Sequence, residues 1–110
     1  MVKHSKWLAW LCVALLFTIW AGCASVPPKE LIERNDHSTL ASWYEKEAAN
    51  LRQRADQMNA MAMDYQKRMT KPGQKSELIR HCEALVDRYN KAAEEADALA
   101  QLHREQVGKP

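Results

Sequence analysis

Between about residues 40 and 69, apolar side chains recur with the seven-residue period of a coiled coil. A row of large side chains comprises Tyr44, Leu51, Met58 and Tyr65, and a mostly alanine row comprises Ala41, Ala48, Ala55, Ala62 and Met69. Together the rows form one apolar stripe along a helix. Alanine at one stripe position lets a partner helix approach closely. The pattern therefore predicts a long helix packed against another.

A second stripe follows, with spacings of four and three residues. Its members are Leu78, Cys82, Leu85, Tyr89, Ala92, Ala96, Leu99 and His103, and it is widened on one flank by Ile79, Val86, Ala93 and Ala100. Ser76 and Glu77 offer a capping hydroxyl and an acidic first turn, which are typical of a helix start. Pro72 and Gly73 form a strong turn signal between the two stripes. A turn is therefore predicted near residues 70–75.

A short turn between two long helices forces them to run antiparallel. The predicted fold class is all-α, an antiparallel and coiled-coil-like helical hairpin over residues 39–108. Two helices alone bury only one stripe each. The widened apolar face of the second helix has no partner within the chain, which favours dimerisation into a four-helix bundle.

Residues 1–22 have the composition of a secretory signal peptide. Lys3 and Lys6 form a basic head, and the uncharged apolar run that follows over 7–20 ends in small residues. That run is shorter than the roughly 20 residues of a membrane-spanning helix. The uncharged stretch nevertheless continues through Val26, so an uncleaved helix in the inner membrane remains an alternative.

The motif Ala21-Gly22-Cys23 after an apolar run resembles the lipobox of bacterial lipoproteins. In that family the cysteine thiol is acylated with diacylglycerol, the preceding peptide is cut, and the new N-terminus usually receives a further acyl chain. The resemblance implies a lipid on Cys23. Because Ala24 rather than aspartate follows, it also implies an outer-membrane anchor with the protein facing the periplasm.

Two features of this region keep an alternative open. Trp20 stands where the lipoprotein family prefers leucine or another aliphatic residue. The sequence Gly22-Cys23-Ala24 also fits the small-x-small site of the ordinary signal peptidase, with cleavage before Ser25. That cleavage would leave no lipid on the mature chain.

Residues 23–38 are predicted to be a tether, because Pro27 and Pro28 favour an extended backbone. Loss of residues 1–22 removes Lys3 and Lys6 but no acidic residue, which leaves 14 basic and 14 acidic side chains. A formally neutral chain with mixed signs has no basic stripe for a nucleic acid. Nucleic acid is therefore excluded as a partner.

One group of side chains matches the chemistry of copper. The hairpin register places His81 and Cys82 beside Met63, with Met58 and Met61 within about two helical turns. Methionine, histidine and cysteine are ligands that suit Cu(I), and the run of methionines resembles the methionine clusters of periplasmic copper-handling proteins. The alternative is that Met58 fills the core and that Cys82 is a small buried side chain.

A histidine pair, His37 and His103, falls at the open end of the predicted hairpin, but two histidines alone do not define a metal site. The sequence carries no phosphate-binding glycine loop, nucleophile elbow or zinc-protease motif, so no enzyme activity is expected. The predicted function is a membrane-anchored structural or protein-interaction module of the bacterial envelope. Its expected partners are the membrane and either a second copy or another envelope protein. A periplasmic copper-binding protein is the alternative.

Overall fold

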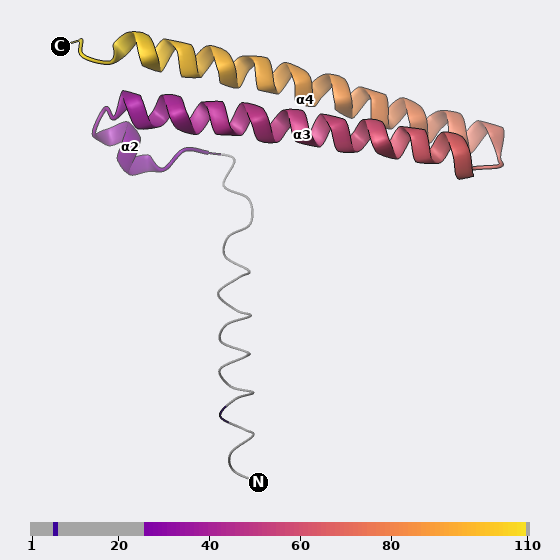
Figure 1. Ribbon diagram of the computed structural model, residues 1–110. Coiled ribbons are helices and arrows are strands. Elements are labelled where there is room, and N and C mark those ends of the chain that lie inside the picture. The colour runs from indigo at the N-terminus through magenta and orange to yellow at the C-terminus, as the bar shows by residue number, and fades with distance from the viewer. Residues whose placement is uncertain (1–5, 7–25, 110) are drawn as a thin grey trace.

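The computed structural model describes residues 6 and 26–109. Three helices follow one another in the latter range: α2 (Lys29–Glu33), α3 (His37–Arg68) and α4 (Pro72–Gln106). The long helices α3 and α4 lie side by side and run antiparallel, while α2 lies beside the start of α3 (Figure 1). The predicted all-α antiparallel hairpin is confirmed.

The start of α3 is set by Asp36. Its carboxylate accepts a hydrogen bond from the backbone N–H of Thr39 at 3.2 Å, which satisfies one of the free donors of the first turn. The hydrogen bonds with Thr39 are the main cause of the lowered pKa of Asp36. Just before it, Asn35 adopts a positive φ of 52°, which turns the chain between α2 and α3. The helix thus begins two residues before the predicted start at residue 39.

The connection between the long helices is shorter than the predicted turn. Pro72 occupies the first turn of α4 and Lys71 is its extended N-cap, so Gly73 and Ser76 lie inside the helix. Proline fits there because its missing N–H would have no partner in the first turn and its φ is already helical. The Pro-Gly pair therefore starts a helix, and the predictions of a turn through residue 75 and of a cap at Ser76 were wrong.

Small side chains form the contact between α3 and α4. The buried residues are Leu40, Ala41, Ala48 and Ala55 on α3, and Cys82, Ala93, Ala96 and Ala100 on α4. Ala48, Ala93 and Ala96 touch one another, with Tyr44 and Leu51 packed against them. As the alanine row predicted, the helices meet through side chains too small to separate their backbones. Among these buried side chains the largest is that of Leu40, which retains 2% of its surface.

The buried row of α4 differs from the prediction in its second half. Ala92 and Leu99 were expected in the contact but are exposed, whereas Ala93 and Ala100 are buried with at most 1% of their surface exposed. A straight α-helix drifts by about 20° for each seven residues relative to a strict heptad. Over three heptads this drift moves the 78–85–92–99 row out of the contact and brings the 79–86–93–100 row into it.

The predicted tether over residues 23–38 is in part helical, because α2 spans residues 29–33 and α3 begins at residue 37. The predicted signal peptide, apart from Lys6, lies outside the described residues, as do residues 23–25. Among the helices of the described part of the chain, none is both long and apolar enough to cross a bilayer.

Candidate functional site

Along one side of the hairpin, ion pairs link the two long helices. Arg52 of α3 donates a hydrogen bond to the carboxylate of Asp97 of α4, and Arg104 of α4 pairs with Glu45 of α3. The hydrogen bond to Asp97 is the main cause of the raised pKa of Arg52. These side chains are about half exposed, so the pairs set the register of the helices more than they stabilise them.

The opposite side of the hairpin carries apolar residues. Successive helical residues are about 100° apart, so Asp97 and Leu99 lie on opposite sides of the contact made by Ala96 and Ala100. The same reasoning places five residues on this side, which we call the apolar edge: Leu78, Leu85, Ala92 and Leu99 of α4, and Met61 of α3.

Exposure increases along the apolar edge from the turn toward the open end. Leu78 and Leu85 are half-buried, Ala92 is exposed, and Leu99 retains 39% of its surface; Met61 on the neighbouring helix retains 41%. This gradient follows from the drift that carries the row out of the contact. The sequence pattern placed Ala92 and Leu99 in the core. It missed their role in the exposed edge because it assumed a strict heptad.

The open end of the hairpin brings two histidines together. The Nδ1 atoms of His37, the first residue of α3, and of His103, near the end of α4, are 2.9 Å apart. The centroids of the two imidazoles are 5.2 Å apart and the rings are tilted by 32°. The ring of Tyr44 stacks on the imidazole of His103, with the ring centroids 5.5 Å apart and an angle of 10° between the ring planes. The sequence placed the histidines at this end but gave no sign of the tyrosine stack.

His103 is held toward its neutral form. Burial between the helices lowers its pKa below the ordinary value of 6.5, and the nearby His37 lowers it further. A neutral imidazole carries one N–H and one free lone pair. The pair therefore forms an Nδ1–H···Nδ1 hydrogen bond when one of the two nitrogens carries the proton.

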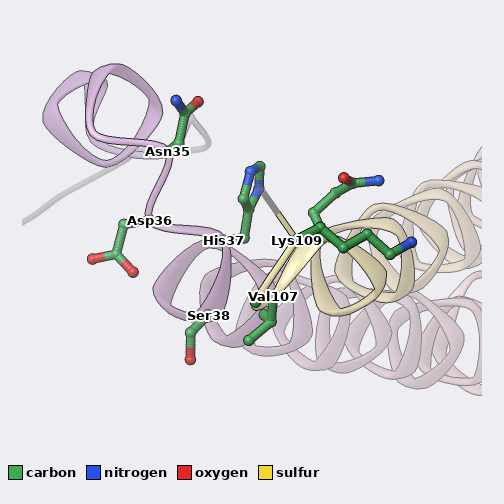
Figure 2. A pocket seen from close by; sticks show the side chains of 8 residues that line it. Asn35, Asp36, His37, Ser38, Val107 and Lys109 are labelled. Carbon is green, nitrogen blue, oxygen red and sulfur yellow. The ribbon is translucent and has the colours of Figure 1, made fainter.

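An open pocket lies against His37 at the same end of the hairpin. Its lining comes from the start of α3 and the end of α4: Asn35, Asp36, His37, Ser38, Gln106, Val107, Gly108 and Lys109. Figure 2 shows the imidazole of His37 beside the C-terminal segment, with the Asp36 and Ser38 side chains pointing away from it. The pocket mixes amide, carboxylate and ammonium groups, so it suits small polar ligands or water more than an apolar molecule.

The predicted copper residues differ widely in exposure. Cys82 is buried with 5% of its surface exposed and Met58 is half-buried, whereas Met61 and Met63 are exposed. The His81 side chain is 64% exposed and lies 3.9 Å from the carboxylate of Glu77. His81 and Cys82 follow each other on a helix and so point about 100° apart. Within the described residues, no three His, Cys, Asp or Glu side chains converge as a metal site would require.

The predicted lipid attachment residue, Cys23, lies outside the described residues. The described chain reaches the hairpin at its open end, where α2 lies beside the start of α3 (Figure 1). No protein family model, curated protein or solved structure matches this chain.

Proposed function

We propose that this chain is a lipoprotein of the bacterial envelope, anchored through Cys23, whose hairpin is a structural module that packs its apolar edge against a second copy. The lipid would hold the protein at the outer membrane with the hairpin in the periplasm. In this proposal the chain assembles and positions proteins rather than catalysing a reaction.

The apolar edge is the observation that carries this proposal. Ion pairs join the two long helices along one side of the hairpin. On the other side, Leu99 and Met61 each have about two-fifths of their surface exposed. The contact between the two helices is made mostly of alanine, which buries little apolar surface for each residue. Packing the edge against another apolar face would bury the remaining surface of the large side chains that the hairpin alone leaves half-buried.

Charges beside the edge favour a second copy as the occupant. Glu47 and Arg54 of α3 are seven residues apart and lie on the same side of the hairpin as the apolar edge. If two copies pack edge to edge about a two-fold axis with their α3 helices antiparallel, Glu47 of each copy faces Arg54 of the other. A two-fold interface must be complementary to itself in this way.

The anchor rests on the sequence motif. Ala21-Gly22-Cys23 ends an apolar run, as in the lipoproteins that it resembles. One or two acyl chains add membrane affinity in proportion to their buried methylene groups, and stable anchoring requires more than one chain. A diacylglyceryl group with a further acyl chain would meet that requirement.

Labelling with radioactive palmitate tests the anchor. The wild-type chain should incorporate the label, and Cys23→Ser should abolish it. Cys82→Ser is the matched control, because Cys82 is the other cysteine downstream of residue 22 and should not affect labelling. Equal labelling of wild type and Cys23→Ser, or none in either, would contradict the anchor.

A further inference from the structure

The end of the hairpin at the connection between α3 and α4 is basic. Residues 64–81, which we call the basic tip, contain two acidic side chains, Asp64 and Glu77. The basic side chains of the tip are Lys67, Arg68, Lys71, Lys75 and Arg80. The rest of the described range 26–109 carries nine basic and twelve acidic side chains. Positive charge is therefore concentrated at the end of the hairpin opposite α2 (Figure 1).

Three lysines of the basic tip are not neutralised by a neighbouring carboxylate. Arg68 and Arg80 each pair with an acidic side chain of their own helix. Lys67, Lys71 and Lys75 take part in none of the ion pairs of the described residues. Lys67 and Lys71 are also exposed. Their charges are therefore available to an anionic partner.

An open pocket on one side of the tip offers hydrogen-bond donors. Lys75, Ser76 and Arg80 of α4 line it beside Gln66 of α3. Ammonium, hydroxyl and guanidinium groups all donate hydrogen bonds to phosphate oxygens. Glu83 also lines the pocket, but it lies farther along α4 from the connection. The end of the pocket nearer the connection therefore suits a phosphate group.

An exposed apolar side chain accompanies these charges. Met63 has 60% of its surface exposed and lies four residues before Lys67, on the same side of α3. A bilayer surface accepts both groups, because the apolar side chain can enter the boundary of the acyl chains while the ammonium stays among the headgroups. A soluble polyanion would use only the charge. The combination favours a lipid surface as the partner.

The proposed anchor and dimer bring the basic tip to the membrane. From Cys23 to the start of α2 at Lys29 the chain can span at most about 20 Å, whereas the 32 residues of α3 extend over about 48 Å. With Glu47 of one copy facing Arg54 of the other, the two-fold axis passes near the middle of α3, and the two anchored ends lie at opposite ends of the pair. Two anchors in one bilayer therefore hold the pair along its surface.

We propose that the basic tip binds anionic phospholipid headgroups of the bilayer that holds the Cys23 anchor, so that the hairpin lies along the membrane. This inference rests on the proposed anchor and dimer. Lysines near an anionic bilayer are attracted to it over about a Debye length. A few lysines bind such a surface weakly, but the anchor keeps the tip close and makes the contact effectively intramolecular. A polymer away from the membrane would require the hairpin to stand, which the two anchors of the pair prevent.

Energy transfer from a fluorophore on the tip to a dye on lipid headgroups measures this contact. The full-length lipidated protein carries Thr70→Cys for labelling, at an exposed position between α3 and α4, and Cys82→Ser to remove the buried thiol. It is reconstituted into vesicles of phosphatidylcholine with or without phosphatidylglycerol. Transfer should be higher with phosphatidylglycerol, and about 1 M salt should lower it to the level in phosphatidylcholine, because the Debye length is then about 3 Å.

Two double variants locate the contact. Lys67→Gln combined with Lys71→Gln removes two unpaired charges from the tip and should lower transfer to the level in phosphatidylcholine. Lys46→Gln combined with Lys91→Gln is the matched control, since it removes the same charge from exposed residues outside the tip. It should retain the transfer of the parent protein. Circular dichroism should show the same helix content in both variants.

The possible failures are distinguishable. Equal transfer in the two kinds of vesicle, from protein that floats with both, would overturn the tip contact and leave the anchor standing. Equal loss of transfer in the two double variants would overturn the assignment to the basic tip. Protein that does not float with phosphatidylcholine vesicles would contradict the anchor and this inference with it. Co-sedimentation with purified peptidoglycan, lost in the tip variant, would assign the tip to the wall polymer instead.

Discussion

His103 illustrates how a single residue couples the two long helices. Its ring lies between Tyr44, which stacks on one face, and His37, whose Nδ1 is 2.9 Å away. Stacking on Tyr44 does not depend on the charge of the His103 ring. Protonation of both imidazoles, however, would remove the hydrogen bond between them and place two positive charges side by side. The open end of the hairpin should therefore be the part most sensitive to mild acid.

Acidification should destabilise the hairpin because the pKa of His103 is lower in the folded chain than its ordinary value of 6.5. As the pH falls below about 6.5, the unfolded chain takes up the proton first, so stability falls until the pH reaches the folded pKa. Well above pH 6.5 both states are neutral at this residue and the effect disappears. Melting temperatures between about pH 5 and 7 measure it.

Two variants locate the source of this pH dependence. His103→Phe keeps a ring on Tyr44 and cannot titrate, so its melting temperature should change less over that range than that of wild type. His81→Gln removes an exposed histidine and should leave the wild-type dependence in place. Equal dependence in wild type and His103→Phe would show that His103 is not responsible.

The burial of Cys82 leads to a second prediction at the scale of a single residue. Only 5% of its surface is exposed, in the contact between α3 and α4. A buried thiol reacts only when the structure opens, so alkylation of the folded chain should be slow and should accelerate in urea. A dominant disulfide-linked dimer on non-reducing gels, lost in Cys82→Ser, would contradict this burial.

At the scale of the helices, the alanine and heptad rows predicted most of the fold. The antiparallel pairing, the alanines of α3 and the burial of Cys82 all follow from residue spacing. The pattern did not predict which row of α4 is buried in its second half. The rows through Ala92 and Ala93 are both apolar, and only the drift of a straight helix decides which of them faces α3. The prediction of a turn at Pro72 was wrong because proline is favoured both in turns and in the first turn of a helix.

Ala93 and Ala92 provide a matched pair that tests this drift. Ala93 has none of its surface exposed, whereas its neighbour Ala92 is exposed. Ala93→Glu would bury an unpaired carboxylate and should cost several kcal/mol, with loss of helical circular dichroism and of cooperative melting. Ala92→Glu lies on the apolar edge, so the comparison is made at dilutions that dissociate a dimer, where it should change the stability of the monomeric hairpin by about 0.5 kcal/mol or less. Equal effects of the two substitutions would mean that the buried row is wrongly assigned.

At the scale of the whole molecule, the chain would combine a lipid anchor at Cys23 with an interaction surface along the hairpin. The candidate sites were only partly predictable from sequence. Cys23 belongs to a local motif that requires no fold, whereas His37 and His103 are 66 residues apart in the sequence and meet only through the register of the two long helices. The apolar edge depends on both that register and the helical drift, so only the three-dimensional arrangement defines it.

Self-association through the apolar edge is the central claim, and sedimentation equilibrium of the lipidated chain in a density-matched detergent tests it most directly. The wild type should sediment as a dimer. Leu99→Asp should sediment as a folded monomer, because it places a charge on the edge. Leu102→Asp is the control, since Leu102 is more exposed, at 56%, and lies on the outer face of α4. It should remain dimeric. A wild-type monomer, or equal disruption by both substitutions, would contradict the claim.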